Sequence, residues 1–298
     1  MEAFLRARQL EVFTAVMRAG TVTAAARMLN ISQPALSQIL IHTEDNLGFL
    51  LFNREKGRLS PTPEALELYP EAERLFAGLE GIRRKTSDLR LGRTGLVRLA
   101  ASTPPAMALV PRVLAEFRAR HPDILLRSHV APLRSMVSML RAGDVAMALA
   151  LDDRLPPDIE IETLGQTGFC CILPEADALT AKEAISFADL DEKTVISYRS
   201  DTRPHEELSL TARAHGMRFS AQIEIDTSIS AVGFVQAGLG IAIVDNLLPW
   251  QQFEGIAIRP LSQTAALPLS LLVLKGKIFS RAEDLMRAQI RAICVGRP

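Results

Sequence analysis

Residues 20–44 read Gly-Thr-Val-Thr-Ala-Ala-Ala-Arg-Met-Leu-Asn-Ile-Ser-Gln-Pro-Ala-Leu-Ser-Gln-Ile-Leu-Ile-His-Thr-Glu, a pattern that predicts two helices joined by a tight turn. Thr23 is a suitable N-cap for the first helix, and the alanines after it are strong helix formers. Ser32 is the expected cap of the second helix, with Pro34 in the first turn, where a missing N–H costs little. The face away from the apolar stripe of that second helix carries Gln33, Ser37, Gln38 and His42.

Short polar side chains at the start of such a helix are suited to base edges in a major groove. Taken alone, the stretch is equally compatible with an ordinary pair of antiparallel helices. Its surroundings favour DNA binding, because residues 5–19 have the apolar spacing of a preceding helix. Residues 54–58, Arg-Glu-Lys-Gly-Arg, predict the turn of a two-stranded wing at Gly57. Its cations would meet phosphates or a minor groove, and a solvated basic turn is the alternative.

Residues 62–90 predict one long helix, with Thr62 as its cap and Pro63 at its first position. Apolar residues recur along it at alternating spacings of three and four, which is typical of a coiled coil. We therefore expect a dimer, and the alternative is a helix that lies on its own domain. The stripe consists of Ala65, Leu68, Ala72, Leu75, Leu79, Ile82, Thr86 and Leu89.

Residues 20–26 and 32–37 together resemble the helix-turn-helix signature of LysR-type transcriptional regulators. The resemblance continues through residues 47–48, residues 51–54 and Thr62, and it covers the rest of the chain by length and element order. It implies a winged helix-turn-helix domain at 1–61, a dimerisation linker helix and hinge at 62–94, and an effector-binding domain at 95–298. The candidate DNA-binding residues are Thr23, Ser32, Gln33, Pro34, Ser37, Gln38, His42, Arg54, Lys56 and Arg58.

Two stretches depart from the family pattern. Gln38 stands where the family usually has a basic residue, and the family often has more basic residues near Ile41 and His42. Pro63-Glu64-Ala65 follows Thr62 where the family usually has Ala-Gly. The run at residues 57–65 is similar to a branch of the family that senses amino acids and opines.

From Gly95 onward the chain alternates between strands and helices. Apolar runs at 96–101, 124–130 and 145–151, with helical patterns at 104–120 and 134–142 between them, predict a parallel βαβαβ sheet. A second set of elements follows, with strands at 169–173, 194–198, 219–225, 240–244 and 267–274 and helices at 204–216, 228–237 and 280–294. The order fits two α/β lobes, lobe I at 95–164 and 267–298 and lobe II at 165–266. The family resemblance implies the same fold, similar to periplasmic solute-binding proteins.

Ligands of open α/β sheets bind beyond the carboxyl ends of the strands, which here predicts an effector site between the lobes. Hydroxyls and free N–H groups at the helix start after residue 101 would favour a carboxylate. Arg199 could pair with the same acidic group, and Asp201 or Asp226 with an amino group. The alternative for each charged loop residue is a solvated turn. The candidate effector-binding residues are Ser102, Thr103, Pro132, Arg134, Asp152, Tyr198, Arg199, Asp201 and Thr227.

Composition sets limits on function. The chain has 298 residues and a formal net charge of zero, so no overall basic field indicates a nucleic-acid partner. Three cysteines, two of them adjacent, indicate a reducing, cytoplasmic compartment and buried packing, with redox sensing as the alternative. Scattered histidines predict no metal site, and no cofactor loop or catalytic nucleophile motif is present.

The sequence therefore predicts a cytoplasmic, non-enzymatic regulator of the LysR type, whose promoter binding is modulated by an amino acid or organic acid. The expected partners are double-stranded DNA, the effector and a second copy in a homodimer or homotetramer; a contact with RNA polymerase is compatible with the resemblance. No membrane partner is expected. The alternatives are a solute-binding protein or a small-molecule enzyme with an unrelated N-terminal helix hairpin.

Overall fold

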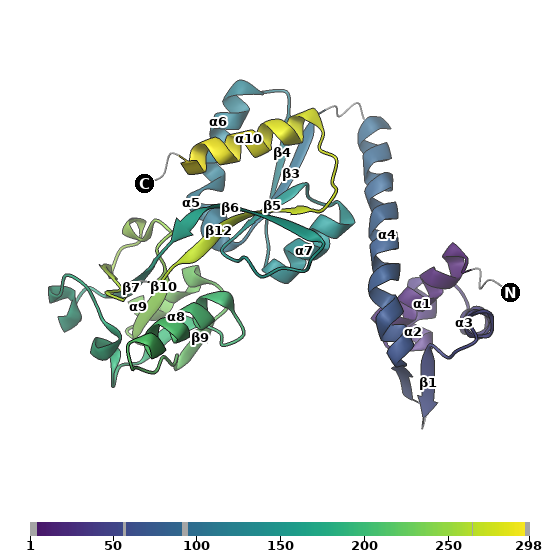
Figure 1. The fold of residues 1–298 in the computed structure, drawn as a ribbon, viewed down its shortest axis with the longest axis horizontal. Helices are drawn as coiled ribbons and strands as arrows, with labels where there is room; N and C mark the ends of the chain where they lie inside the picture. The colour runs from purple at the N-terminus through teal and green to yellow at the C-terminus, as the bar shows by residue number, and fades with distance from the viewer. Residues whose placement is uncertain (1–4, 56–57, 91–94, 264, 296–298) are drawn as a thin grey trace. The chain divides into compact units, whose positions relative to one another are not determined.

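The computed structural model describes residues 5–55, 58–90, 95–263 and 265–295 (Figure 1). The chain forms two compact units, with the main division between Ser87 and Asp88. The first unit contains α1 (Ala7–Ala19), α2 (Val22–Met28), α3 (Gln33–Leu47), β1 (Phe52–Glu55), β2 (Arg58–Pro61) and most of α4 (Pro63–Arg90). Strands β1 and β2 pair antiparallel, from Phe52 opposite Pro61 to Glu55 opposite Arg58. A winged helix-turn-helix is thus confirmed.

The helix caps of this unit follow from local side-chain chemistry. Helix α2 is capped by Thr21, whose hydroxyl accepts a hydrogen bond from the Ala24 N–H at 3.2 Å. The prediction of Thr23 as the cap is wrong, because Thr23 already lies inside the first turn of α2. Ser32 caps α3 as predicted, with its hydroxyl accepting from the Ala35 N–H. Asn30 supplies a left-handed backbone in the turn between the helices, at φ 53°.

Helix α4 uses its apolar stripe in two ways. The first three members pack into the core of the first unit: Ala65, Leu68 and Ala72. Thr62 caps the helix as predicted, because its hydroxyl accepts from the Ala65 N–H at 3.2 Å. Leu75, Leu79 and Ile82 are exposed in the single chain, at 47%, 41% and 62%. The stripe therefore belongs partly to its own domain, and only its later part is open to a second copy. Leu89 is among the residues whose side chains lie outside the description.

The second unit contains two five-stranded sheets. The first has the order β4-β3-β5-β12-β6, with β3 (Leu96–Ala101) parallel to β4 (Leu125–Val130) and to β5 (Met147–Ala150). The predicted parallel βαβαβ arrangement is therefore confirmed. Strand β12 (Leu267–Leu274) runs antiparallel to β5 and to β6 (Ile159–Thr167). The helices of this lobe are α5 (Thr103–Ala108), α6 (Val110–Arg120), α7 (Leu133–Ala142) and α10 (Arg281–Val295).

The second sheet has the order β11-β7-β10-β8-β9. Its strands are β7 (Phe169–Pro174), β8 (Val195–Tyr198), β9 (Ile223–Ile225), β10 (Ile241–Asp245) and β11 (Ile256–Pro260), of which β11 was not predicted. The remaining elements of this lobe are α8 (Arg203–Ala214), α9 (Ala231–Gln236) and the short 3-10 turns η1 (Ala178–Ala181), η2 (Phe187–Leu190), η3 (Ser228–Ser230) and η4 (Trp250–Gln252).

The predicted helix at 104–120 is two helices in the structure. Helix α5 ends at Ala108, and Leu109, at φ −120° and ψ −50°, separates it from α6. Pro111 explains the break, because its ring has no N–H to donate and clashes with the carbonyl one turn earlier in a continuous helix. The result is that α5 is a separate six-residue element.

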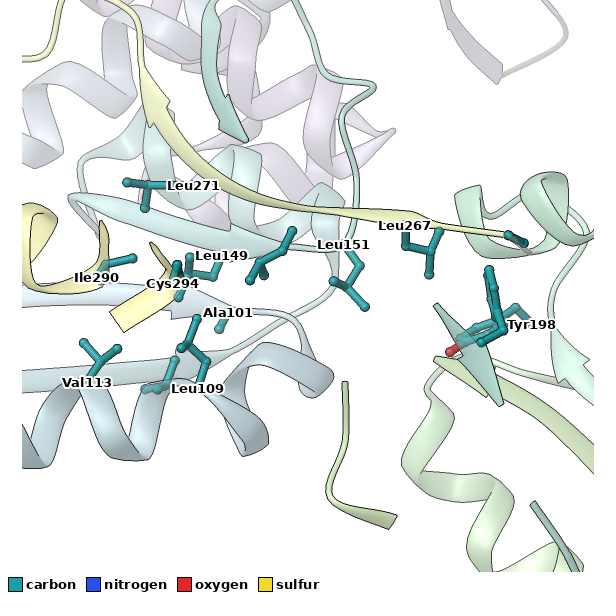
Figure 2. Packing of buried hydrophobic residues seen from close by; sticks show 14 of the residues in the cluster. Ala101, Leu109, Val113, Leu149, Leu151, Tyr198, Leu267, Leu271, Ile290 and Cys294 are labelled. Carbon is teal, nitrogen blue, oxygen red and sulfur yellow. The ribbon is translucent and has the colours of Figure 1, made fainter. Parts of the chain in front are cut away.

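One buried cluster extends through both lobes (Figure 2). Leu149 and Ile290 belong to its part in the first lobe, and Tyr198 to its part in the second. Leu267 begins β12 opposite Thr167 of β6, so these two strands form the paired link between the lobes. The lobe boundaries drawn from the sequence stay a prediction. None of the described helices has the length and hydropathy that a membrane span requires.

Candidate DNA-binding surface and interlobe site

The rotation of α3 about its axis is fixed by its buried face. Leu36 and Leu40 are fully buried. Glu44, also buried, accepts hydrogen bonds from the backbone N–H groups of Leu51 at 2.8 Å and Phe52 at 3.1 Å. These bonds join α3 to the start of the wing, so the opposite face of the helix points away from the core.

That opposite face carries most of the residues predicted to contact DNA. Gln33 and Ser37 are joined, since Gln33 Nε2 donates to Ser37 Oγ at 3.0 Å. Ser37 is half-buried; the others are exposed: Thr23, Ser32, Gln33, Pro34, Gln38 and His42. Sequence reasoning did not select Ile41, which is 44% exposed between Gln38 and Asp45. A helical wheel could have found it, because it lies one turn from both neighbours.

The positive charge around this face comes from outside the helix. Helix α3 contains no lysine or arginine between Gln33 and Leu47. Arg18 of α1 forms an ion pair with Glu73 at 2.9 Å, and Arg8 pairs with Glu11 at 2.6 Å, so both are partly neutralised. Lys56 lies outside the described residues, as do the side chains of Arg54 and Arg58, and their phosphate contacts stay a prediction.

Two buried hydroxyls meet the boundary between the lobes of the second unit. Ser102 precedes α5 in the first lobe, Thr227 precedes η3 in the second, and α5 and η3 are in contact. Ser102 Oγ and Thr227 Oγ1 are buried without a hydrogen-bond partner among the described residues. Buried polar groups are normally paired, so two such hydroxyls on facing elements indicate a place for a ligand group.

The helix start itself offers few donors. Helix α5 begins Thr103-Pro104-Pro105, and neither proline has an N–H. The Ser102 N–H already donates to the Leu149 carbonyl at 2.9 Å. The expected array of free N–H groups is therefore reduced to that of Thr103, and a carboxylate here would depend on hydroxyls more than on helix amides.

Arg199 is engaged by carboxylates of its own lobe. Its guanidinium pairs with Asp201 at 2.7 Å and with Asp226 at 3.1 Å. The Arg199 hydrogen bond holds the pKa of Asp201 below its ordinary value, and Arg134 of the first lobe contributes to this lowering. Arg134 and Asp201 are both predicted effector residues, and their contacts with an effector stay a prediction. Pro132, two residues before Arg134, is exposed.

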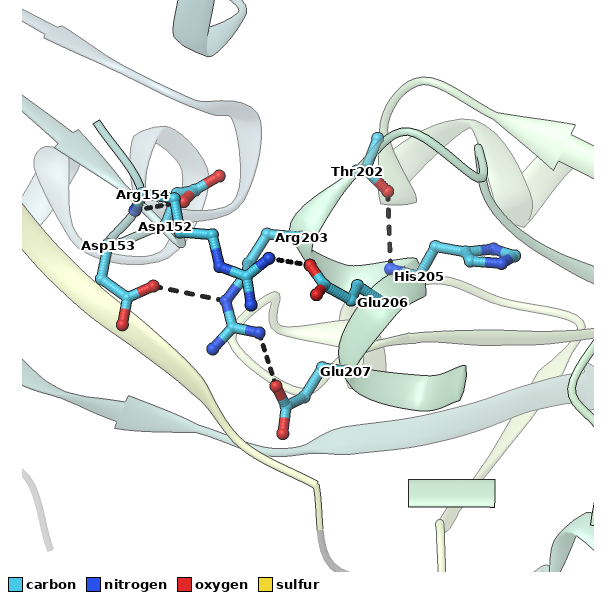
Figure 3. A network of polar contacts seen from close by, with 8 residues as sticks. All are labelled: Asp152, Asp153, Arg154, Thr202, Arg203, His205, Glu206 and Glu207. Carbon is cyan, nitrogen blue, oxygen red and sulfur yellow. Dashed lines mark hydrogen bonds and ion pairs between the residues drawn. The ribbon is translucent and has the colours of Figure 1, made fainter. Parts of the chain in front are cut away.

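A second set of charges connects the lobes directly (Figure 3). Asp153 and Arg154, after β5, pair with residues of α8: Asp153 with Arg203 at 3.3 Å, and Arg154 with Glu206. Arg203 also pairs with Glu207 at 2.7 Å, and its side chain is only 14% exposed. Sequence reasoning selected neither Arg203 nor these glutamates.

Asp152, a predicted effector residue, is half-buried beside this network. Burial raises the pKa of Asp152, although its Oδ1 accepts a hydrogen bond from the Arg154 N–H at 2.8 Å. A carboxyl with a raised pKa has lost part of its hydration, so a cationic ligand group would stabilise its charged form.

Tyr198 lies in a buried hydrogen-bond network of the second lobe. Its hydroxyl donates to Asp245 Oδ2 at 2.8 Å and accepts from the Asp245 N–H at 2.8 Å. Trp250 Nε1 donates to the Asp245 carbonyl at 2.7 Å. Burial raises the pKa of both Tyr198 and Asp245. The hydroxyl of Tyr198 is thus occupied and its side chain is buried in the core cluster, so its predicted contact with an effector stays a prediction.

The cysteines are packing residues in the structure. Cys170, Cys171 and Cys294 are buried and free of disulfides. Burial raises the pKa of Cys171 to about 12 and that of Cys170 well above its usual value, so neither forms a reactive thiolate at neutral pH. Among the described residues, no cluster of histidine, cysteine, aspartate or glutamate is arranged to hold a metal ion.

Comparison with known proteins gives consistent matches over both units. Residues 7–66 match the family model "Bacterial regulatory helix-turn-helix protein, lysR family", and residues 90–294 match "LysR substrate binding domain". The regulatory protein NocR of Agrobacterium fabrum is 29% identical over 81% of this chain and 80% of its own. The octopine catabolism/uptake operon regulatory protein OccR of Rhizobium meliloti is 28% identical over 86% and 84%. The crystal structure of CbnR, a LysR family transcriptional regulator, aligns with a TM-score of 0.69 at 20% identity, over 97% of this chain and 99% of CbnR.

Proposed function

This chain belongs to the LysR family of bacterial transcriptional regulators, and from this premise we propose that an amino acid, bound between its two lobes, controls its binding to promoter DNA. Organic acids are the wider class to which this effector belongs. The relatives reported above are regulators and not enzymes, so no reaction is assigned to the interlobe site.

The observation that carries the proposal is the pair of unsatisfied hydroxyls. Ser102 Oγ and Thr227 Oγ1 come from different lobes and have no partner among the described residues. A ligand that bonds both hydroxyls has an affinity that depends on the distance between the lobes. Such a difference in affinity is what a ligand needs in order to shift a conformational equilibrium.

The charges beside the hydroxyls support a zwitterion. Arg134 could pair with a carboxylate and Asp152 with an ammonium group, whereas Arg199 and Asp201 are paired with each other and would exchange partners to bind the same ligand. A ligand with one charge of each sign would leave the net charge of the interlobe region unchanged. A dianion would compete with several fixed carboxylates for the same arginines. By its name, OccR regulates an operon for octopine catabolism and uptake, which supports a small organic effector for this chain.

Two copies would join through the exposed half of the α4 stripe. Leu75, Leu79 and Ile82 expose apolar surface at the spacing of a coiled-coil seam. A dimer would present two α3 helices to two half-sites of an operator. A tetramer and a contact with RNA polymerase stay predictions from the family resemblance.

The test begins with a thermal-shift screen of amino acids and organic acids on the full chain, because a ligand of the native state raises apparent stability. Titration calorimetry then compares the wild type with Ser102→Ala and Thr227→Val for the compound that scores highest. Each change should lower effector affinity by about tenfold, the size of a lost hydrogen bond to a charged group. Effector-free DNA binding should not change.

Ser128→Ala is the matched control, since Ser128 is an exposed serine of β4 and should leave the affinity unaltered. If both hydroxyl variants bind the effector as tightly as the wild type, the effector does not lie between α5 and η3. A screen in which only compounds without an ammonium group bind would restrict the effector to the organic acids.

A further inference from the structure

Ile41 lies in the middle of the exposed face of α3, and we propose that it selects the operator sequence by contacting the 5-methyl group of a thymine in the major groove. The inference rests on the proposed function, because it requires α3 to enter that groove. It adds a specificity-determining residue to the polar ones that the sequence suggested.

The structure fixes where Ile41 points. The neighbouring Leu40 is fully buried in the core, and Glu44 is held by the N–H groups of Leu51 and Phe52. A rotation of α3 about its axis that buried Ile41 would break these contacts, so Ile41 stays on the exposed face. Residues 34, 38, 41 and 45 follow one another at spacings of four, three and four, and therefore form one stripe along the outer face. Ile41, at 44% exposure, is the large apolar member of that stripe.

The chemistry of the groove leaves Ile41 one favourable contact. Major-groove base edges present donors, acceptors and a single apolar group, the thymine methyl. When Ile41 packs against a thymine, its side chain and the 5-methyl group would both lose contact with water, which is favourable. Against any other edge, Ile41 would remove water from a polar group without replacing its hydrogen bond, which is unfavourable. Selection for thymine thus comes from attraction to one base and a penalty for the others.

The side chain is also suited to this task by its stiffness. Isoleucine is β-branched, and in a helix it strongly prefers one χ1 rotamer, so little entropy is lost when it meets a fixed target. Since α3 has no lysine or arginine, no long cation of the same helix competes for this stretch of groove. Gln38 and His42, adjacent to Ile41 on the surface, are left to read polar edges on either side of the thymine.

The experiment compares the wild type and Ile41→Ala on duplexes that contain or lack a given thymine methyl group. The full chain first selects its preferred duplex from a random library. Each thymine of that duplex is then replaced in turn by uracil, which lacks only the 5-methyl group, and the dissociation constants of the wild type and of Ile41→Ala are measured by fluorescence anisotropy at one salt concentration.

For the wild type, uracil at one position of each half-site should weaken binding by about fourfold, the factor that burial of one methyl group supplies. The same uracil should leave the affinity of Ile41→Ala unchanged, because the partner of the methyl is already gone. Met28→Ala is the matched control: Met28 is 54% exposed at the end of α2, outside α3, and this variant should keep the full uracil effect.

A uracil scan with the same profile for the wild type and Ile41→Ala would overturn the role of Ile41 and leave the proposed function intact. A chain that enriches no sequence from the library would overturn the proposed function and this inference together. Thermal unfolding of Ile41→Ala should match the wild type, since the side chain is exposed and alanine favours helix. A change in the uracil profile therefore reports on recognition and not on folding.

Discussion

The exposed face of α3 carries no lysine or arginine, whereas three arginines near the junction of the two lobes are paired with carboxylates: Arg154, Arg199 and Arg203. Both regions are proposed to bind a partner, and the partner of the face without cations is the more highly charged one. DNA is a polyanion, while the proposed zwitterion carries one charge of each sign.

The difference teaches that affinity for DNA and selectivity among DNA sequences can come from different residues. Phosphate contacts supply most of the affinity of a DNA-binding protein, and they carry no direct sequence information. A helix without cations therefore contributes selectivity, and affinity must come from cations elsewhere and from the coupling of two copies. Near the junction of the lobes these arginines are already paired with carboxylates, so the effector binds among charges that are already neutralised. A substitution in one region should therefore leave binding at the other unaltered, and three predictions use this independence.

The largest effect is expected from the dimer seam. Leu75→Asp with Leu79→Asp would place charges in an apolar seam, where an unpaired charge is strongly unfavourable. Sedimentation should show monomers. Binding to the selected duplex should fall by about a hundredfold or more, since two half-sites are then bound independently. Effector affinity, measured by calorimetry, should stay the same, because Leu75 and Leu79 belong to the first unit and the proposed effector site to the second.

The matched control for the seam is Leu66→Asp. Leu66 is 57% exposed on α4 but lies off the apolar stripe, so this variant should stay dimeric. A double variant that remained a dimer would move the dimer contact to the second unit. A monomer that kept its full DNA affinity would mean that α3 and the wing bind DNA more strongly than their charge suggests.

A smaller effect, on the effector alone, is expected from Arg203→Met. Arg203 lies between Asp153 of the first lobe and Glu207 of its own helix. Without the guanidinium, a ligand that holds the lobes together must hold two unpaired carboxylates near each other. Effector affinity should fall by about tenfold, between the effect of breaking an exposed pair and a buried one. Added salt should weaken effector binding of the wild type in the same direction.

Arg213→Met serves as the control for this change. Arg213 is in the last turn of α8, exposed, and donates to the Ser209 carbonyl at 3.2 Å, so its loss should leave the effector affinity unchanged. If Arg203→Met binds the effector as well as the wild type at low salt, the pair with Asp153 does not exist in the effector-bound form.

The two regions also differ in how well the sequence predicted them. Helix α3 was predicted because its signals are local: Ser32 at the cap, Pro34 in the first turn and Leu36 and Leu40 on one face. Thr23 was mistaken for the cap of α2 because Thr21 and Thr23 are equally good caps, and only the backbone conformation of the turn distinguishes them.

The order of strands and helices in the second unit was predictable for the same reason, while its details were not. Strand β11 (Ile256–Pro260) was missed because it is short, contains Arg259 and ends in proline, so its period is weak. The pair of Asp153 and Arg203 joins residues 50 apart in the sequence, and no periodicity points to it. Ser102 was selected as a helix start, but the absence of partners for its hydroxyl among the described residues required the packed structure.

The smallest effect is expected on the exposed face of α3, where an added cation would remove the difference from the interlobe region. Ile41→Lys places a cation at the centre of that face. If the face enters the groove, the ammonium group can reach a phosphate, and the plot of log affinity against log salt should steepen by about one. Affinity at low salt should rise for all duplexes, and the preference for thymine should disappear, because a phosphate contact carries no sequence information. Met28→Lys adds the same charge outside α3 and should change the slope less. Equal slopes in the two variants would mean that only net charge matters and that the exposed face of α3 is not the surface that meets DNA.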